Sequence, residues 1–126
     1  MHAAAPDLIA VTGDFVEHKT SEVERNIPFL KALAGLVPVY AVSGNQDHWR
    51  DWPYIAGQLK ETRVNVLENE HIRISRGGSV IILAGVSDPA TGHGDLARAL
   101  PEEAGNVTVL LAHAPTWFLP DYREKP

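Results

Sequence analysis

Three apolar runs that each end in a polar residue constrain the fold of this chain more than any other feature of its sequence. The runs cover residues 7–14, 37–47 and 106–113, and their terminal segments contain Asp14, Asn45 and His113. Short apolar runs rich in valine are typical of buried strands, and open α/β sheets bind ligands beyond the carboxyl ends of their strands. We therefore expect Asp14, Asn45 and His113 to converge on one point in space.

Length and composition indicate one globular domain over residues 1–126. The chain is 44% hydrophobic and 21% charged, which is ordinary for a domain with its own core. Its net charge of −5 argues against nucleic-acid binding, because no basic patch could displace counterions from phosphates. The absence of cysteine excludes disulfides and thiolate metal sites. Neither end resembles a signal peptide and no apolar run approaches about 18 residues, so we expect a cytoplasmic protein without a membrane span.

The first third of the chain predicts a strand, a helix and a second strand. A strand is expected over residues 8–11, and a helix begins near Ser21, where Ser21 and Glu24 have the spacing of a capping box. A second strand at 37–42 completes a βαβ unit, whose two strands should be parallel.

A proline inside this helix predicts an irregularity. Pro28 lacks the N–H group that a helix interior uses, so a kink or a restart is expected at Asn26. Gly35 fits the end of the helix. Between them, one apolar stripe at helical spacing should face the core, formed by Ile27, Leu30, Leu33 and Ala34.

The rest of the chain alternates short elements with turns. Asp51 is expected to cap a helix with Pro53 in its first turn, ending near residue 61. Gly77-Gly78 is a two-residue hairpin turn between strands at 71–75 and 79–86. The other predicted elements are strands at 64–67 and 106–111, a loop at 87–95 and a short helix at 96–100.

Asp14, Asn45 and His113 offer the ligand types that borderline divalent cations prefer. Carboxylate, amide oxygen and imidazole suit Mn²⁺, Fe²⁺ or Zn²⁺, and a carboxylate can bridge two ions. Each residue alone has an ordinary structural explanation: a Gly-Asp turn, an Asx turn, or a polar group at a strand end. Taken from the residues alone, the metal site and these structural explanations both remain open.

Three segments resemble ordered motifs of the calcineurin-like metallophosphoesterases, most closely in the bacterial branch. PDLIAVTGDFVE, VYAVSGNQDHW and VTVLLAHAP are similar to the family's G-D-x-x-D, its G-N-H-D and its strand-borne histidine. VNVLENE, the predicted hairpin, LAGVSDPATG and DLARAL also resemble members of that branch, so the resemblance covers nearly the whole chain.

The resemblance implies an α/β fold, a partial calcineurin-like sandwich of mixed β-sheets flanked by helices. It also implies a metal-dependent hydrolase of small-molecule phosphoesters, in which two divalent ions about 3.5–4 Å apart clamp the phosphoryl group and activate a hydroxide for in-line attack. In that scheme Asp14 is the bridging carboxylate, and Asn45 and His113 are ligands of the second ion.

The sequence departs from the family pattern in four places. The first motif, D-x-H, would lie before Ala3, and the last, G-H-x-H, would follow His113 by some tens of residues; neither is in the sequence. Glu17 replaces the second aspartate of G-D-x-x-D, and Gln46 replaces the histidine that donates a proton. Losing such a group typically lowers the rate by about 10²–10⁴. We therefore expect an incomplete metal site and a chain that is weakly active or inactive by itself.

Neighbouring side chains are candidates for supporting roles. Asp47 should orient whatever occupies position 46, and His48 is a possible substitute proton donor, although a solvated surface histidine is the simpler reading. His93 could approach the mouth of the site. Three aromatic residues could line a substrate pocket or simply pack a helix onto the sheet, namely Trp49, Trp52 and Tyr54.

Two functions from different classes follow. The first is a two-metal phosphoesterase that lacks the family's first and last motif-bearing strands. The second is a non-catalytic, degenerate family member that serves as an interaction module and assembles with itself. Either way, missing strands would leave unpaired sheet edges, so we expect a homodimer or a larger assembly.

Overall fold

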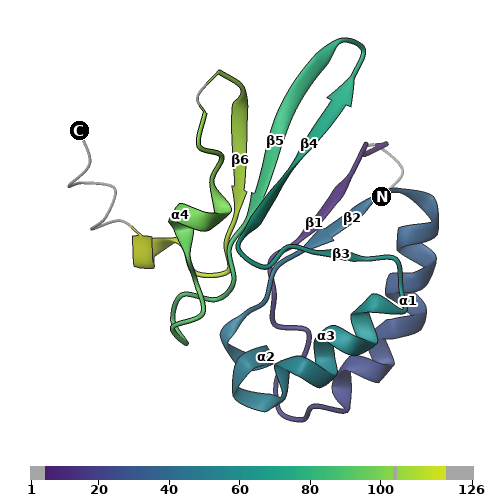
Figure 1. Cartoon of the computed structure of the whole chain (residues 1–126). Helices are drawn as coiled ribbons and strands as arrows, with labels where there is room; N and C mark the ends of the chain where they lie inside the picture. Colours follow the sequence, from purple (N-terminus) through teal and green to yellow (C-terminus); the bar gives the residue numbers. More distant parts are fainter. Residues whose placement is uncertain (1–4, 104, 119–126) are drawn as a thin grey trace.

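Two small sheets pack face to face between helices in the computed structural model, which describes residues 5–103 and 105–118 (Figure 1). The elements in chain order are β1 (Ile9–Val11), α1 (Glu22–Leu36), β2 (Val39–Ala41), α2 (Asn45–Arg50), α3 (Trp52–Lys60), β3 (Asn65–Val66), β4 (Glu70–Arg76), β5 (Ser79–Gly85), α4 (Leu96–Ala99), β6 (Val107–Leu111) and the 3₁₀ helix η1 (Pro115–Phe118).

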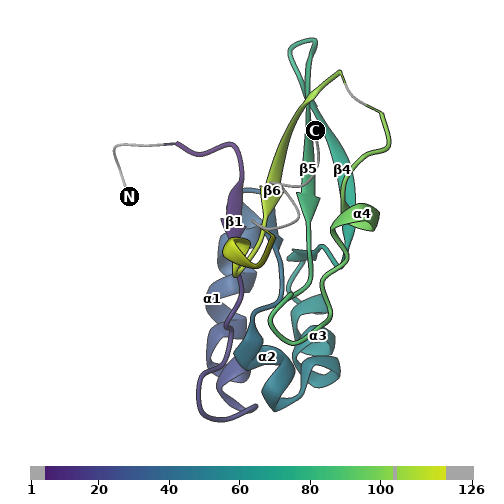
Figure 2. The same ribbon diagram turned by 90° about the vertical axis from the view of Figure 1, so that its left-hand side faces the viewer.

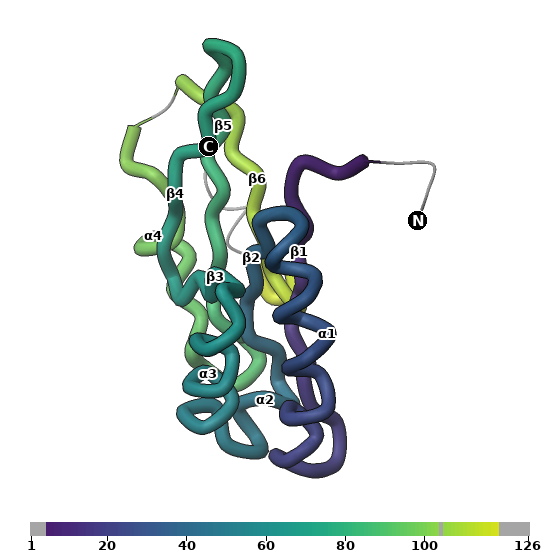
Figure 3. The backbone as a smooth tube through the Cα atoms, turned by 90° about the vertical axis from the view of Figure 1, so that its right-hand side faces the viewer, coloured from purple at the N-terminus to yellow at the C-terminus, as the bar shows by residue number. Residues whose placement is uncertain are grey.

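The first sheet has the order β1-β2-β3 and is entirely parallel, which confirms the predicted βαβ unit. Side chains alternate between the two faces of β2, as in any strand. Val39 and Ala41 face α1 and α3, where Val23, Leu30, Ile55 and Leu59 complete a buried core. Figure 3 shows these two helices side by side along one flank of the molecule.

The second sheet has the order β4-β5-β6 and is mixed. β4 and β5 form the predicted antiparallel hairpin around Gly77-Gly78, and β6 lies parallel to β5. Figure 2 shows this hairpin extending well past the end of the first sheet. A second core lies between the sheets, where Val42 and Leu67 pack with Leu83 and Leu111. A third, built from Val86, Ala99 and Phe118, joins the second sheet to α4 and η1.

Helix α1 differs from its prediction in three details. The capping box of Ser21 and Glu24 does not form; instead the Glu22 carboxylate accepts the N–H groups of His18 and Lys19, which lower the pKa of Glu22. The helix does not restart at Asn26, and it continues through Gly35 to Leu36. Pro28 is tolerated because it lies on the exposed face, where water can reach the carbonyl of Glu24 that lacks a helical partner, while Leu30 on the other face is buried.

The remaining elements agree with their predictions, apart from α2 and η1, which were not predicted. Asp51 caps α3 by accepting the N–H of Tyr54, with Pro53 in the first turn. Within residues 5–103 and 105–118, none of the helices combines the length and apolar character that crossing a bilayer requires.

Substituting Gly85 tests the packing between the sheets. A Cβ at this buried glycine would lie 2.3 Å from Leu67 Cβ and 2.9 Å from Val42 Cγ1, so Gly85→Ala should lower the free energy of unfolding by about 1–3 kcal/mol. Gly57 in α3 has open space around it, so Gly57→Ala should raise stability by about 0.5–1 kcal/mol. Urea titrations measure the free energy of unfolding of the two variants. Equal changes in both would contradict the tight packing of Gly85 between the sheets.

Candidate functional site

Three side chains far apart in the sequence meet where β1, β2 and β6 end. His113 follows β6, and its Nε2 atom lies 2.9 Å from Asn45 Oδ1 and 3.4 Å from Asp14 Oδ2. Asp14 follows β1, and Asn45 is the first residue of α2. The side chains of Asp14 and His113 are 36% and 23% exposed, so the cluster is open to solvent. The expected convergence is therefore present, while the role of these residues as metal ligands stays a prediction.

Hydrogen bonding of His113 makes this cluster rich in lone pairs. Its Nδ1 atom lies 2.7 Å from the carbonyl oxygen of Thr12, which can only accept, so Nδ1 carries the hydrogen. In a neutral ring, Nε2 then presents a lone pair to the oxygens of Asn45 and Asp14. One nitrogen lone pair facing two oxygens is an arrangement suited to a cation between them.

The spacing of these atoms fits a divalent ion. Ligands held about 2.1 Å from one ion in tetrahedral or octahedral geometry lie about 3.0–3.4 Å apart, close to the two distances found here. Metal-binding histidines also commonly donate their second ring N–H to a backbone carbonyl, as His113 does to Thr12. Across the described part of the chain, no group of three His, Cys, Asp or Glu side chains is placed to hold a metal. The candidate centre depends on Asn45 as its third ligand.

Asp47 fixes the backbone around this cluster. Its fully buried carboxylate accepts N–H groups from two loops: Oδ2 from Asp14 (2.9 Å) and Gly44 (2.9 Å), and Oδ1 from Phe15 (2.8 Å) and Val16 (3.3 Å). Burial raises the pKa of Asp47, and the four N–H groups oppose that rise. Asp47 was expected to orient position 46; in the hydrogen bonds of the described residues it holds the backbone of Asp14 instead.

The two loops approach so closely that a side chain at Gly44 would not fit. A Cβ there would lie 2.3 Å from Asp14 Oδ1. Asp14 itself has φ 57°, a left-handed conformation that is uncommon for non-glycine residues and is often found at functional sites. The N–H of Gln46 donates to Asp14 Oδ1 (3.1 Å), which leaves Oδ2 toward His113.

Gln46 lies at this centre, whereas Glu17 does not. Gln46 is the second residue of α2, a helix that was not predicted because its first turn reads as a polar loop. Its side-chain Oε1 is buried and has no hydrogen-bond partner among the described residues. Glu17 is exposed and faces His18, and its carbonyl accepts from Arg50. The motif position occupied by Glu17 therefore contributes no side chain to the cluster.

His48 and His93 pair with each other rather than with Asp14. The His48 ring bonds through Nε2 to Ser43 Oγ (2.7 Å) and stacks on His93, with ring centroids 4.0 Å apart and planes 12° apart. Burial and then His93 lower the pKa of His48, against the carboxylates of Asp88 and Glu68. His48 is thus a half-buried residue in a neighbouring hollow, and among the described residues its side-chain hydrogen bond and ring contacts go to Ser43, His93 and Trp52.

The three aromatic candidates separate into different environments. Trp52 lines the same hollow, donates its Nε1–H to Glu68 (2.8 Å) and packs its ring 5.3 Å from His48. The Tyr54 hydroxyl donates to Glu24 and so joins α3 to α1, a packing role. Trp49 is 63% exposed.

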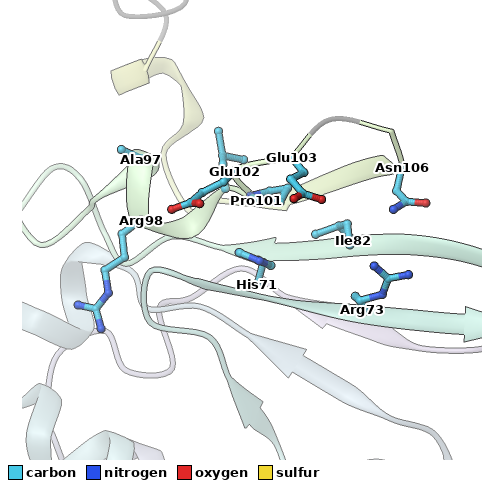
Figure 4. A pocket seen from close by; sticks show the side chains of 10 residues that line it. His71, Arg73, Ile82, Ala97, Arg98, Pro101, Glu102, Glu103 and Asn106 are labelled. Carbon is cyan, nitrogen blue, oxygen red and sulfur yellow. The ribbon is translucent and has the colours of Figure 1, made fainter.

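A second hollow lies on the outer face of the second sheet. It encloses about 530 Å³ between β4 and α4, and Figure 4 shows the side chains that line it, including His71, Arg73, Glu102 and Glu103. None of the predicted site residues lines this hollow. It is therefore separate from the cluster of Asp14, Asn45 and His113.

Comparison with known proteins covers almost the whole chain. The family model described as calcineurin-like phosphoesterase matches residues 2–125. The uncharacterized metallophosphoesterase YkoQ of Bacillus subtilis (strain 168) is 32% identical over 123 residues, 90% of this chain and 44% of that protein. A transmembrane protein with metallophosphoesterase domain from Bos taurus is 33% identical over 125 residues, 87% of this chain and 28% of that protein. The chain thus spans less than half the length of either relative.

Replacing Asp47 tests whether its carboxylate holds the site together. In Asp47→Asn, two of the four N–H donors would face an NH₂ group, so the free energy of unfolding should fall by about 3 kcal/mol. Asp51→Asn makes the same chemical change at a helix cap, where asparagine performs equally well, and should change stability by less than about 0.5 kcal/mol. Chemical denaturation compares the two; a mild effect at position 47 would show that the loops are held by other contacts.

Proposed function

This chain belongs to the calcineurin-like phosphoesterase family, and we propose that Asp14, Asn45 and His113 bind a divalent metal ion with which the chain hydrolyses phosphoesters weakly. The family consists of metal-dependent phosphoester hydrolases. The observation that carries the proposal for this chain is the cluster of three acceptor atoms, because His113 Nε2 faces two oxygens within 3.4 Å.

Each residue has a role that follows from its contacts. A bound divalent ion would polarise the phosphoryl oxygens and make hydroxide available at neutral pH. Asp14 would hold this ion through the oxygen that faces His113, while the Gln46 N–H holds its other oxygen. Asn45 and His113 would be the other two ligands of the same ion. Asp47 keeps the Asp14 loop against Gly44.

Two features support weak rather than full activity. The described residues offer no additional carboxylate or imidazole that would complete a group of three such ligands. Gln46 occupies the position of the motif histidine, and its amide can donate a hydrogen bond but cannot deliver a proton to a leaving group. We propose that one ion binds weakly and that proton transfer limits the rate.

Metal binding is the direct test of the proposal. Crystals soaked in millimolar Mn²⁺ should show anomalous density between Asp14, Asn45 and His113. Asp14→Asn and His113→Ala should each abolish it, because each removes one of three ligands. His18→Ala is the matched control, since this histidine is exposed and lies beside Glu17, away from the cluster. No density at this position in the wild-type chain would refute the metal site.

Restoring a proton donor at position 46 tests the proposal that proton transfer limits the rate. Gln46→His should raise the rate of hydrolysis of bis(p-nitrophenyl) phosphate in Mn²⁺ by about 10²–10⁴, the usual contribution of a general acid. Gln58→His makes the same change on α3 and should leave the rate unaltered. Equal rates for wild type and Gln46→His would show that proton transfer is not what limits this chain.

A non-catalytic interaction module is the second candidate, and the edge of the second sheet favours it. β6 pairs with β5, and no further strand among the described residues pairs with its outer edge. Val107 and Val109 on this strand are 69% and 44% exposed. Exposed edges with apolar side chains favour pairing with another copy. In this function the chain would form a homodimer through β6.

Light scattering at micromolar concentration tests the assembly. The wild-type chain should have the mass of a dimer or a larger oligomer, and Val109→Lys should shift it to a monomer, because a charge on an edge strand opposes pairing. Leu36→Lys is the control, as Leu36 is also apolar and is even more exposed (81%) but lies on α1. A wild-type monomer would eliminate the self-assembling module.

A further inference from the structure

A hollow of about 450 Å³ begins one helical turn from the candidate metal ligands. His48, which lines it, is three residues after Asn45 on α2, and side chains at this spacing have Cβ atoms about 5–6 Å apart. We propose that this hollow binds the alcohol portion of a phosphoester whose phosphoryl group lies at Asp14, and that this portion is a polyhydroxylated, sugar-like ring. The proposal rests on the proposed function, since the phosphoryl position defines where the alcohol lies.

The loop that forms one wall of the hollow is held in place at several points. Asn69 accepts the N–H groups of Ser87 (3.0 Å) and Asp95 (2.9 Å) through Oδ1 and donates from Nδ2 to the carbonyl of His93 (2.9 Å). Thr91 Oγ1 bonds to His93 Nδ1 (2.9 Å). The His93 ring is therefore oriented before any ligand arrives, and so the entropy lost on binding is small.

Ser43 connects this wall to the strand that leads to Asn45. Its Oγ accepts the N–H of Asp88 (3.1 Å) and bonds to His48 Nε2 (2.7 Å), which fixes His48 beneath His93. Asp88 is fully buried, and its Oδ1 has no hydrogen-bond partner in the described residues. Ser43 stands two residues before Asn45, so the metal centre and the hollow share one rigid segment.

The chemistry of the lining favours a ligand rich in hydroxyl groups. Glu68 uses Oε1 to accept from Trp52, and Glu70 uses Oε1 to accept from the Glu68 N–H; in the described hydrogen bonds the second oxygen of each carboxylate remains for a ligand donor. Arg98 supplies donors, and Figure 4 shows its guanidinium turned away from the other residues of the outer hollow. Two carboxylates would repel a phosphate, so they favour a neutral donor and keep the phosphoryl group at Asp14.

The aromatic side chains that line the hollow provide flat surfaces on which a ligand ring can pack. The His48 ring stacks on His93, with centroids 4.0 Å apart, and lies tilted against Trp52, with centroids 5.3 Å apart. Parallel stacking keeps the ring nitrogens of the two histidines in separate parallel planes, so their in-plane lone pairs do not converge on one metal ion. Flat rings beside carboxylates instead match a sugar, whose C–H face packs on a ring while its hydroxyls donate to acceptors.

Calorimetry with the intact chain and Mn²⁺ tests the proposal. Glucose 1-phosphate should bind about tenfold more tightly than inorganic phosphate. One or two additional hydrogen bonds, together with packing of the sugar on a ring, account for a difference of this size. His93→Ala and, separately, Glu70→Gln should remove this preference while leaving phosphate binding unchanged. His18→Ala, an exposed histidine away from the hollow, should retain it. A preference that survives both substitutions in the hollow would overturn the proposal.

Two further arms separate this inference from the metal centre. Methyl α-glucoside has no phosphate, and in the metal-free chain it should shift the NMR signals of Trp52 and His93 but not those of His18. If methyl α-glucoside shifts these signals while Mn²⁺ and phosphate fail to bind, sugar binding by the hollow is supported and the proposed hydrolase is refuted. If methyl α-glucoside shifts neither signal, the assignment to a sugar-like ligand is wrong. The same holds if O-phosphoethanolamine, and not glucose 1-phosphate, binds more tightly than inorganic phosphate.

Discussion

The buried carboxylate of Asp47 is the interaction on which the rest of the site depends. Four backbone N–H groups from two loops converge on it, and they include those of Asp14 and Gly44. Without this shared acceptor, the donors would be buried without partners and the two loops would have no reason to touch. The same contact places Asp14 in a left-handed conformation and brings its carboxylate to the first turn of α2.

The segment from Ser43 to His48 contributes side chains both to the candidate metal cluster and to the neighbouring hollow. Asn45 faces Asp14 and His113, while His48 turns toward His93 and Trp52. Both lie where parallel strands end, the position at which α/β sheets bind ligands. The arrangement joins a cluster of lone pairs suited to a cation with a polar hollow suited to an organic group, as a phosphoester requires on its two sides.

Membership of the calcineurin-like phosphoesterases explains the fold, while individual residues define how this chain differs. Gln46 keeps the hydrogen-bonding capacity of the motif position and loses its ability to transfer a proton. Glu17 lies outside the cluster altogether. Edge strand β6 exposes Val107 and Val109, which gives the proposed interaction module a physical basis beside the proposed hydrolase.

The sequence by itself determined the order of the strands, the parallel βαβ unit, the hairpin and the capped helix α3, because periodicity, turn glycines and caps act over a few residues. It also named Asp14, Asn45 and His113, since each directly follows an apolar run. Helix α2, the unbroken α1, the partners of Asp47 and the pairing of His48 with His93 were decided only by the tertiary structure. These depend on contacts between residues 31 to 45 positions apart, and on burial that overrides local preference at Pro28 and Gly35. The sequence does not give the spatial distance between residues so far apart in the chain. The partner of each buried N–H group is therefore known only from the packed structure.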